Sequence, residues 1–131
     1  MANLPKPKSA NGRTCMTIER LENGQRFCRV LRYNGTVYLA GLTADDLSGD
    51  TTAQTKQILA KIDACLAKAG SDKTKLLSAQ IWLRDIADFD MMNTAWDAWI
   101  DRSAMPVRAT VEARLAGDQY RVEIMVTAAV G

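Results

Sequence analysis

Apolar and polar residues alternate along the last quarter of the chain, a pattern typical of β-strands with one buried face. Every second position is apolar over residues 105–115, and the alternation returns over residues 121–128 after a polar stretch at 116–119. This pattern predicts a C-terminal hairpin of two strands and a turn. Its polar face is expected to carry an arginine and a carboxylate together, Arg108 and Glu123.

The front half of the chain contains a second hairpin signal. Asn34 and Gly35 separate two runs rich in β-forming residues, 27–33 and 36–42. An Asn-Gly pair between such runs favours a type I′ turn, because both residues tolerate positive φ angles. Residues 17–21 are expected to add a short first strand.

Two helical patterns and one more strand lie between these hairpins. Residues 51–69 carry apolar side chains at helical spacing on one face, with Thr51 and Gln54 fitting a capping box at the start. The apolar run 76–83 has the length of an interior strand. Residues 89–100 return to helical spacing with aromatic and methionine side chains, which we expect in the core.

This order of elements predicts an α+β fold with a mixed six-stranded sheet and two helices on one face. The strands remain too apolar for the other face to be left to water. We therefore expect homo-oligomerisation through the open face of the sheet. The apolar strand residues behind this expectation are Val30, Tyr38, Trp82, Met125 and Val126.

Length and composition fit one ordinary globular domain. The chain has 131 residues, of which 47% are hydrophobic and 24% charged. Residues 1–16, rich in proline and lysine, are expected to form a flexible N-terminal tail, and residues 17–131 a single domain. No segment has the character of a signal peptide or a membrane span, which favours the cytoplasm. A net charge of +2 gives no reason to expect nucleic acid or a membrane as partner.

The chain contains no histidine, which narrows the chemistry. Ser-His-Asp and Cys-His nucleophilic systems are excluded, and three widely spaced cysteines offer no zinc site. The odd number of cysteines, Cys15, Cys28 and Cys65, favours free thiols over disulfides. Cys65 falls in the apolar stripe of the first helix and is expected to be buried and inert.

The C-terminal motif resembles the signature of a known family. Pro106, Arg108, Val111 and Leu115, followed by Val122-Glu123-Ile124, are similar to the signature of the RidA/YjgF family of reactive-intermediate deaminases. The resemblance extends over about residues 18–129. Further matching positions are Asn34-Gly35, Ala40-Gly41, Gln54, Gln57 to Leu59, Ile62-Asp63, Ala69-Gly70, Leu83, Asp85, Asp88-Phe89 and Asn93.

The resemblance implies a fold and an activity. Members of this family have a chorismate-mutase-like fold and form homotrimers with a cleft between each pair of subunits. Active members need no cofactor and hydrolyse enamines and imines, such as 2-aminoacrylate, to 2-keto acids and ammonia. The expected ligand is therefore a small 2-imino or 2-keto acid, and the expected class is a hydrolase acting on C–N bonds.

The resemblance also implies roles for single residues. Arg108 matches the arginine that binds the substrate carboxylate, and Glu123 matches the catalytic glutamate that positions or activates water. Gly41 and Asn93 match positions that line the substrate cleft. Arginine suits its role because its planar fork meets a carboxylate with two parallel hydrogen bonds.

Three pocket positions depart from the family pattern. Phe27 stands where deaminating members have a tyrosine, Ala40 replaces a serine, and Thr110 replaces a cysteine. We retain all three as substrate-binding positions. Each lost polar contact costs on the order of 1–3 kcal/mol, enough to change specificity or rate.

The predicted hairpin leaves the site geometry open. It would set Glu123 opposite Glu112, roughly 13 Å along the strand from Arg108. Either a bulge shortens this path or different subunits supply the two residues. On residue type alone, Arg108 is also explained by a surface ion pair and Glu123 by a solvated strand position.

Three functions are compatible with the sequence. The first is an imine deaminase, and the second is a non-catalytic or differently specific trimer that binds small carboxylates. The third is the ribonuclease or translation-inhibitor activity with which the family has also been labelled. The third is disfavoured because the chain has no histidine for acid–base cleavage and no basic strip with interleaved aromatic residues.

Overall fold

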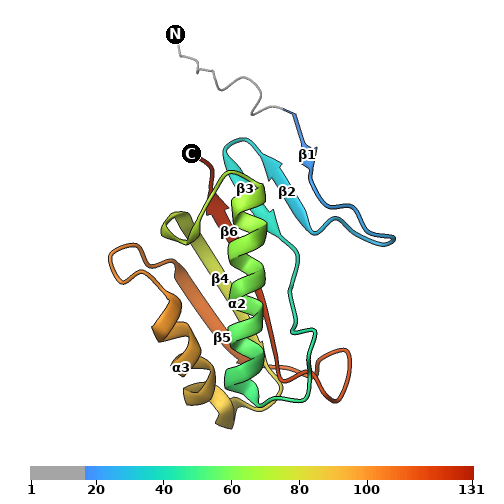
Figure 1. Ribbon diagram of the computed structural model, residues 1–131, viewed down its shortest axis with the longest axis vertical. Helices are drawn as coiled ribbons and strands as arrows, with labels where there is room; N and C mark the ends of the chain where they lie inside the picture. Colours follow the sequence, from blue (N-terminus) through green and yellow to red (C-terminus); the bar gives the residue numbers. More distant parts are fainter. Residues whose placement is uncertain (1–16) are drawn as a thin grey trace.

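The computed structural model describes residues 17–131 (Figure 1). The tail expected over residues 1–16 lies outside the described residues, as does Cys15. The elements follow in the order β1 Glu19–Arg20, β2 Val30–Tyr33, β3 Thr36–Leu39, α2 Thr51–Lys68, β4 Leu76–Leu83, α3 Phe89–Trp99, β5 Val107–Glu112 and β6 Val122–Ala129, with short 3-10 turns at Lys73–Lys75 and Ile86–Asp88.

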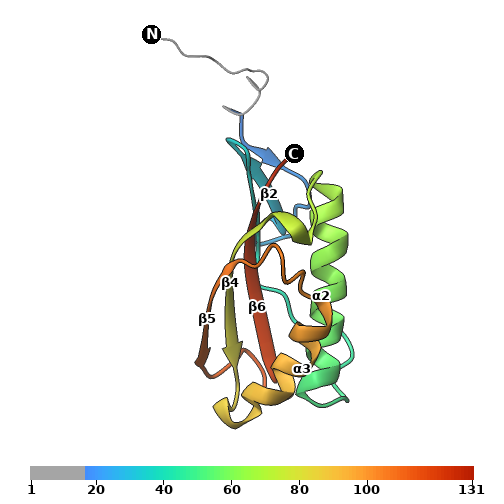
Figure 2. The ribbon, with the colours of Figure 1, turned by 90° about the vertical axis from the view of Figure 1, so that its left-hand side faces the viewer.

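The six strands form one mixed sheet, as predicted. Their order is β1-β2-β3-β6-β4-β5, and the β4–β5 pair is parallel while all other neighbours are antiparallel. Both helices lie on the same face of this sheet (Figure 2). The α+β architecture with helices on one face is therefore confirmed.

The predicted C-terminal hairpin is wrong, because β5 and β6 are not neighbours. β4 lies between them and pairs with β5 in parallel and with β6 in antiparallel orientation. Alternation of apolar residues specifies which face of a strand is buried, but it does not specify the pairing partner. The β4–α3–β5 segment instead forms a crossover unit, in which a helix connects two parallel strands.

The front hairpin follows the sequence prediction. Asn34 and Gly35 both have positive φ angles, 52° and 80°, as a type I′ turn requires. β2 and β3 pair on either side of this turn, with Tyr33 opposite Thr36.

The start of α2 differs from the predicted capping box by one residue. Asp50 is the N-cap, and its side chain accepts a hydrogen bond from the backbone N–H of Ala53. A carboxylate caps a helix as well as a hydroxyl does, so Thr51 is free to enter the first turn. Gln54 is buried and connects the loop before α2 with the loop before β6, since its amide donates to the carbonyls of Leu47 and Gln119 and accepts from the N–H of Arg121.

The core lies between the sheet and the two helices. Cys65 belongs to it, which confirms the prediction that this cysteine is buried, and burial raises the pKa of its thiol. Val30 and Val126 also point into this core rather than toward the open face. The largest fully buried side chains include Ile58, Ile62, Leu66, Ile81, Leu83, Met92 and Ile124.

The opposite face of the sheet carries exposed apolar side chains. Tyr38 and Met125 are 45% and 41% exposed, and Val107 on the edge strand is 73% exposed. Apolar surface of this kind on a sheet is typical of a protein contact. Among residues 17–131, no helix has the length and apolar character needed to cross a membrane.

Candidate functional site

Arg108 lies on the helix-facing side of β5, beneath α3. Its partner on β4 is Ala79, which belongs to the core. The Arg108 Nη1 donates a 2.8 Å hydrogen bond to Oδ1 of Asn93, and the guanidinium carbon lies 5.1 Å from the ring centre of Trp96 and 5.8 Å from that of Phe89. The β4–α3–β5 crossover therefore places one arginine against one face of a helix.

The guanidinium of Arg108 is half-buried and has no carboxylate partner. Within the described part of the chain, no acidic oxygen lies within the 4.0 Å of an ion pair. Burial lowers the pKa of Arg108, and the charge of Asp97 opposes that shift. An arginine remains charged at any physiological pH, so its positive charge is available to an anionic ligand.

Thr110 lies two residues beyond Arg108 on the same side of β5. Its hydroxyl oxygen is buried and, among the described residues, has no hydrogen-bond partner. A buried hydroxyl without a partner is unfavourable by about 1–3 kcal/mol. A ligand reaches this oxygen only after the side chain rotates, because the oxygen has essentially no exposed surface.

Glu123 lies on β6, opposite Trp82 of β4. Burial raises the pKa of its carboxyl above the ordinary glutamate value of 4.5. Within residues 17–131, its carboxylate has no ion-pair partner. A partly desolvated carboxylate of this kind has the character of a general base.

Gly41 lies directly beneath the Glu123 carboxylate. A Cβ atom built on Gly41 would overlap with Oε2 of Glu123. The strand register explains the contact, because the neighbouring Leu42 pairs with Ile124. The absence of a side chain at Gly41 thus allows the Glu123 carboxylate to approach the backbone closely.

Replacing Gly41 with alanine should displace the Glu123 carboxylate while leaving the fold intact, because the overlapping atom is the end of a flexible side chain. We expect a slower reaction at unchanged thermal stability, measured by steady-state kinetics and calorimetry. Gly35→Ala is the contrasting control: a Cβ there meets no atom within 4 Å, but the φ of +80° makes alanine destabilising, so this variant should lose thermal stability and keep its activity. Unchanged activity of the Gly41 variant would argue against a role for the Glu123 position.

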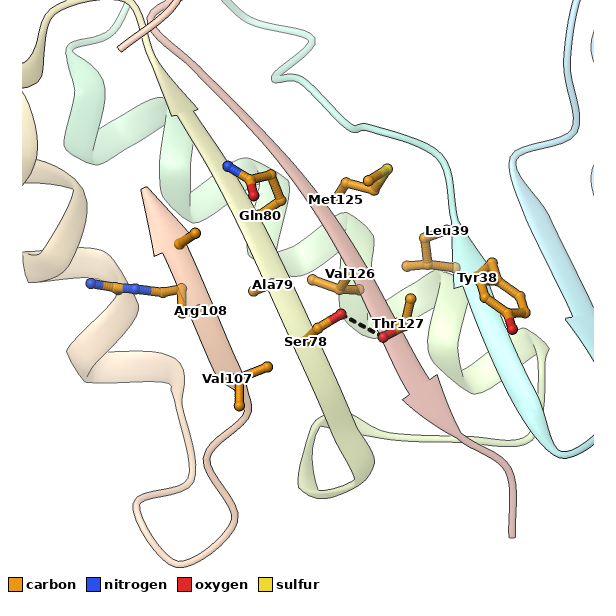
Figure 3. A pocket seen from close by; sticks show the side chains of 11 residues that line it. Tyr38, Leu39, Ser78, Ala79, Gln80, Val107, Arg108, Met125, Val126 and Thr127 are labelled. Carbon is orange, nitrogen blue, oxygen red and sulfur yellow. Dashed lines mark hydrogen bonds between the residues drawn. The ribbon is translucent and has the colours of Figure 1, made fainter. Parts of the chain in front are cut away.

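Arg108 and Glu123 project from opposite faces of the sheet, which corrects the expectation that they share one face. Arg108 shares the helix-facing side with Ala79, whereas Glu123 shares the open side with Trp82. The register places their Cα atoms about 14 Å apart. In Figure 3, Arg108 extends away from the sheet toward the helix at its edge. A bulge therefore does not bring them together within one chain.

The open face is hollowed beside β5. The hollow has a volume of about 470 Å³, and its polar groups include Gln80 and a pair of hydroxyls, Ser78 and Thr127, joined by a 2.6 Å hydrogen bond (Figure 3). Apolar atoms of Val107 and Met125 complete its wall. It combines apolar surface with a few polar groups, as sites for ligands or partners do.

The remaining predicted site residues are not gathered around Arg108. Phe27 is 63% exposed in the turn between β1 and β2, and β3, β6 and β4 separate this hairpin from β5. Ala40 follows β3, next to Gly41, and donates its backbone N–H to Arg29. Within the part of the chain that the structure describes, no group of three or more His, Cys, Asp or Glu side chains is placed to hold a metal ion.

Two residues that contact Arg108 were missed as site residues in the sequence. Phe89 and Trp96 were assigned to the core because aromatic side chains at helical spacing usually pack there. They lie four residues before and three residues after Asn93, which places all three on one face of α3. In the sequence, this helical spacing around Asn93, a predicted site residue, could have indicated that both rings lie at the site.

The chain is similar to known proteins in both sequence and structure. The profile of the family described as endoribonuclease L-PSP matches residues 17–130. The chain is 45% identical over 115 residues to the RutC family protein YoaB of Escherichia coli strain K12, covering 88% of this chain and 100% of that protein. It is 44% identical over 113 residues to a RutC family protein of Haemophilus ducreyi, covering 86% and 97% of the two chains.

Solved structures agree with these matches. A YjgF family protein from Neisseria meningitidis has a TM-score of 0.85 at 42% identity, covering 89% of this chain and 98% of that chain. A member of the conserved Rid protein family from Yersinia pestis has a TM-score of 0.81 at 26% identity, covering 87% and 100%. On sequence and fold together, the chain belongs to the RidA/YjgF family, whose relatives include the RutC family proteins.

Proposed function

We propose that this protein hydrolyses enamines and imines of the 2-aminoacrylate type to 2-keto acids and ammonia, in a cleft between subunits. The observation that carries the proposal is the environment of Arg108. Its half-buried guanidinium contacts neutral groups, and within residues 17–131 it forms no ion pair with a carboxylate. Such a group is suited to a substrate carboxylate. We place the reaction in the cytoplasm, the compartment expected from the sequence.

The chemistry requires little besides position and one base. The enamine first takes a proton on its terminal carbon and becomes an iminium. A water oxygen then bonds to the iminium carbon while Glu123 removes a proton from that water. Glu123 returns that proton to the nitrogen, and the C–N bond then breaks while the carbinol hydroxyl gives its proton to Glu123, which releases ammonia and leaves the 2-keto acid. Glu123 passes this proton to solvent, which balances the proton that the enamine took from solvent in the first step. The electrophile is already activated, so no metal or covalent intermediate is needed.

The assembly of the site calls for a second copy of the chain. Arg108 and Glu123 lie on opposite faces of one sheet, so we propose that the Arg108 of one subunit meets the Glu123 of its neighbour. The exposed apolar side chains of the open face, such as Val107 and Met125, supply the surface for that contact. The family resemblance indicates a homotrimer.

Replacing Met125 with glutamate should therefore dissociate the trimer, because it buries a charge in an apolar contact. We expect light scattering to give three chain masses for the wild type and one for the variant, with loss of activity. Ala60→Glu is the control, since Ala60 is exposed on α2, away from the open face. A monomeric wild-type protein would remove the intersubunit cleft.

The activity is tested with imines generated in solution. An amino-acid oxidase or a pyridoxal-phosphate dehydratase supplies the imine, and semicarbazide traps it. We expect the protein to accelerate release of the 2-keto acid and to suppress trapping. Equal trapping with and without the protein would reject the deaminase proposal.

A second function follows from the three pocket departures. Phe27, Ala40 and Thr110 replace polar family residues, which favours a trimer that binds small carboxylates without hydrolysing imines. Binding of 2-ketobutyrate without any acceleration of imine hydrolysis would establish this alternative.

A ribonuclease is the weakest candidate, although the family profile carries that description. The chain has no histidine and a net charge of only +2, which leaves neither an imidazole for acid–base cleavage nor a strong attraction to phosphates. Loss of RNA cleavage on further purification would reject the ribonuclease function.

A further inference from the structure

Among the described residues, the side chains that contact the guanidinium of Arg108 come from α3. Asn93 accepts its 2.8 Å hydrogen bond, the sulfur of Met92 lies 4.0 Å from Nη1, and the rings of Trp96 and Phe89 lie at 5.1 and 5.8 Å. All four residues are neutral. Asp97, whose carboxylate lies within ion-pair distance of Arg102, acts on Arg108 only from a longer distance, so among the described residues the groups in contact with this half-buried cation are neutral.

Aromatic rings suit this task because they attract a cation and leave its charge intact. The face of a ring is electron-rich, and a guanidinium is weakly hydrated and stacks on it readily. A carboxylate in the same place would neutralise the arginine and compete with an anionic ligand. An arginine held by rings and an amide keeps free N–H groups for that ligand.

We propose that Phe89 and Trp96 are positioning residues that hold Arg108 in place of a counter-carboxylate, so that the guanidinium binds one ligand carboxylate. The proposal deepens the function proposed above and rests on it. It assigns to the aromatic face of α3 a role in ligand binding beyond packing.

The two rings differ in how they are supported. Trp96 is only 5% exposed and packs against Trp99, with ring centres 5.5 Å apart. The Trp99 indole N–H in turn donates to the carboxylate of Asp63 on α2, at 3.0 and 3.1 Å. Trp96 thus contacts Arg108 from the protein core, whereas Phe89, 39% exposed, contacts it from the solvent-accessible side.

Phe89→Leu is the first test, because the partly exposed position tolerates substitution. We expect the dissociation constant of 2-ketobutyrate, measured by calorimetry, to rise roughly 3- to 30-fold, the range of a cation–π contact. Phe89→Tyr should restore the affinity. Tyr33→Leu is the matched control, since it removes an aromatic ring at the end of β2, a strand that β3, β6 and β4 separate from β5. Unchanged affinity in both Phe89→Leu and Trp96→Leu would reject the positioning role.

A double-mutant cycle separates positioning from a general effect on the fold. If Phe89 acts through Arg108, Phe89→Leu should have no further effect in the Arg108→Ala background. Equal losses in both backgrounds would show that the ring acts without Arg108 and would overturn the proposal. The Nε–H signal of Arg108, assigned with Arg108→Lys, gives a readout without ligand, because removing the ring should change its ring-current shift.

Failure of this inference is distinguishable from failure of the proposed function. If Arg108→Ala itself leaves 2-ketobutyrate binding unchanged, the carboxylate site is wrong and the positioning role falls with it. If Arg108→Ala weakens binding while Phe89→Leu and Trp96→Leu do not, only the positioning role is rejected.

Discussion

Replacing Arg108 with alanine should weaken the binding of 2-ketobutyrate about 100-fold, which corresponds to roughly 3 kcal/mol. The variant loses two charge-assisted hydrogen bonds to the carboxylate. It also leaves Asn93 and the rings of α3 without the cation that they contact. Calorimetric titration of the wild type and the variant measures the difference directly.

Two controls sharpen this prediction. Arg108→Lys keeps the charge but loses the planar fork, so it should recover only part of the affinity. Arg20→Ala removes an exposed arginine on β1, far from β5 in the sheet, and should leave binding unchanged. Wild-type affinity in Arg108→Ala would mean that another group binds the carboxylate.

The sequence predicted the elements of this fold well and their pairing only in part. The Asn34-Gly35 turn formed as expected because its geometry is local, requiring two positive φ angles in adjacent residues. The pairing of β6 with β4 is not local. It depends on β4 lying between β5 and β6, which no turn residue specifies.

The family motif proposes site residues, but it does not give their positions in space. Motif spacing proposed Arg108 and Glu123, whereas their separation on opposite faces of the sheet follows from strand register and could not be predicted from the sequence. The helical spacing of Phe89 and Trp96 predicted ordinary core positions, although Phe89 is 39% exposed. Only the crossover that brings β5 beneath α3 shows that these rings contact an arginine.

Replacing Glu123 with glutamine should slow imine hydrolysis by about 10²- to 10⁴-fold, the usual contribution of a general base. The amide keeps the shape of the side chain but cannot accept the proton of the attacking water. Binding of 2-ketobutyrate should remain unchanged, so kcat falls while the affinity stays. Glu112→Gln is the control, because glutamine there still accepts the hydrogen bond from the N–H of Ile86.

The pH dependence provides a second test of the same residue. The base works only when ionised, and burial raises the pKa of Glu123 above 4.5, so the wild-type rate should fall with decreasing pH at a midpoint above 4.5. This acid limb should be absent from the residual rate of Glu123→Gln. An acid limb that persists unchanged in the variant would assign the titration, and the role of base, to another group.

Stability should follow the sign of that pKa shift. A carboxyl whose pKa is higher in the folded protein binds its proton more tightly there than in the unfolded chain. Its contribution to the free energy of unfolding is therefore fully present below 4.5 and is lost as the pH rises through the folded pKa. Glu123→Gln does not titrate, so the wild type should lose stability relative to this variant over that window in denaturant unfolding. A difference between the two proteins that is independent of pH would mean that Glu123 is solvated like any exposed carboxylate, and the structural basis for its role as a base would be removed.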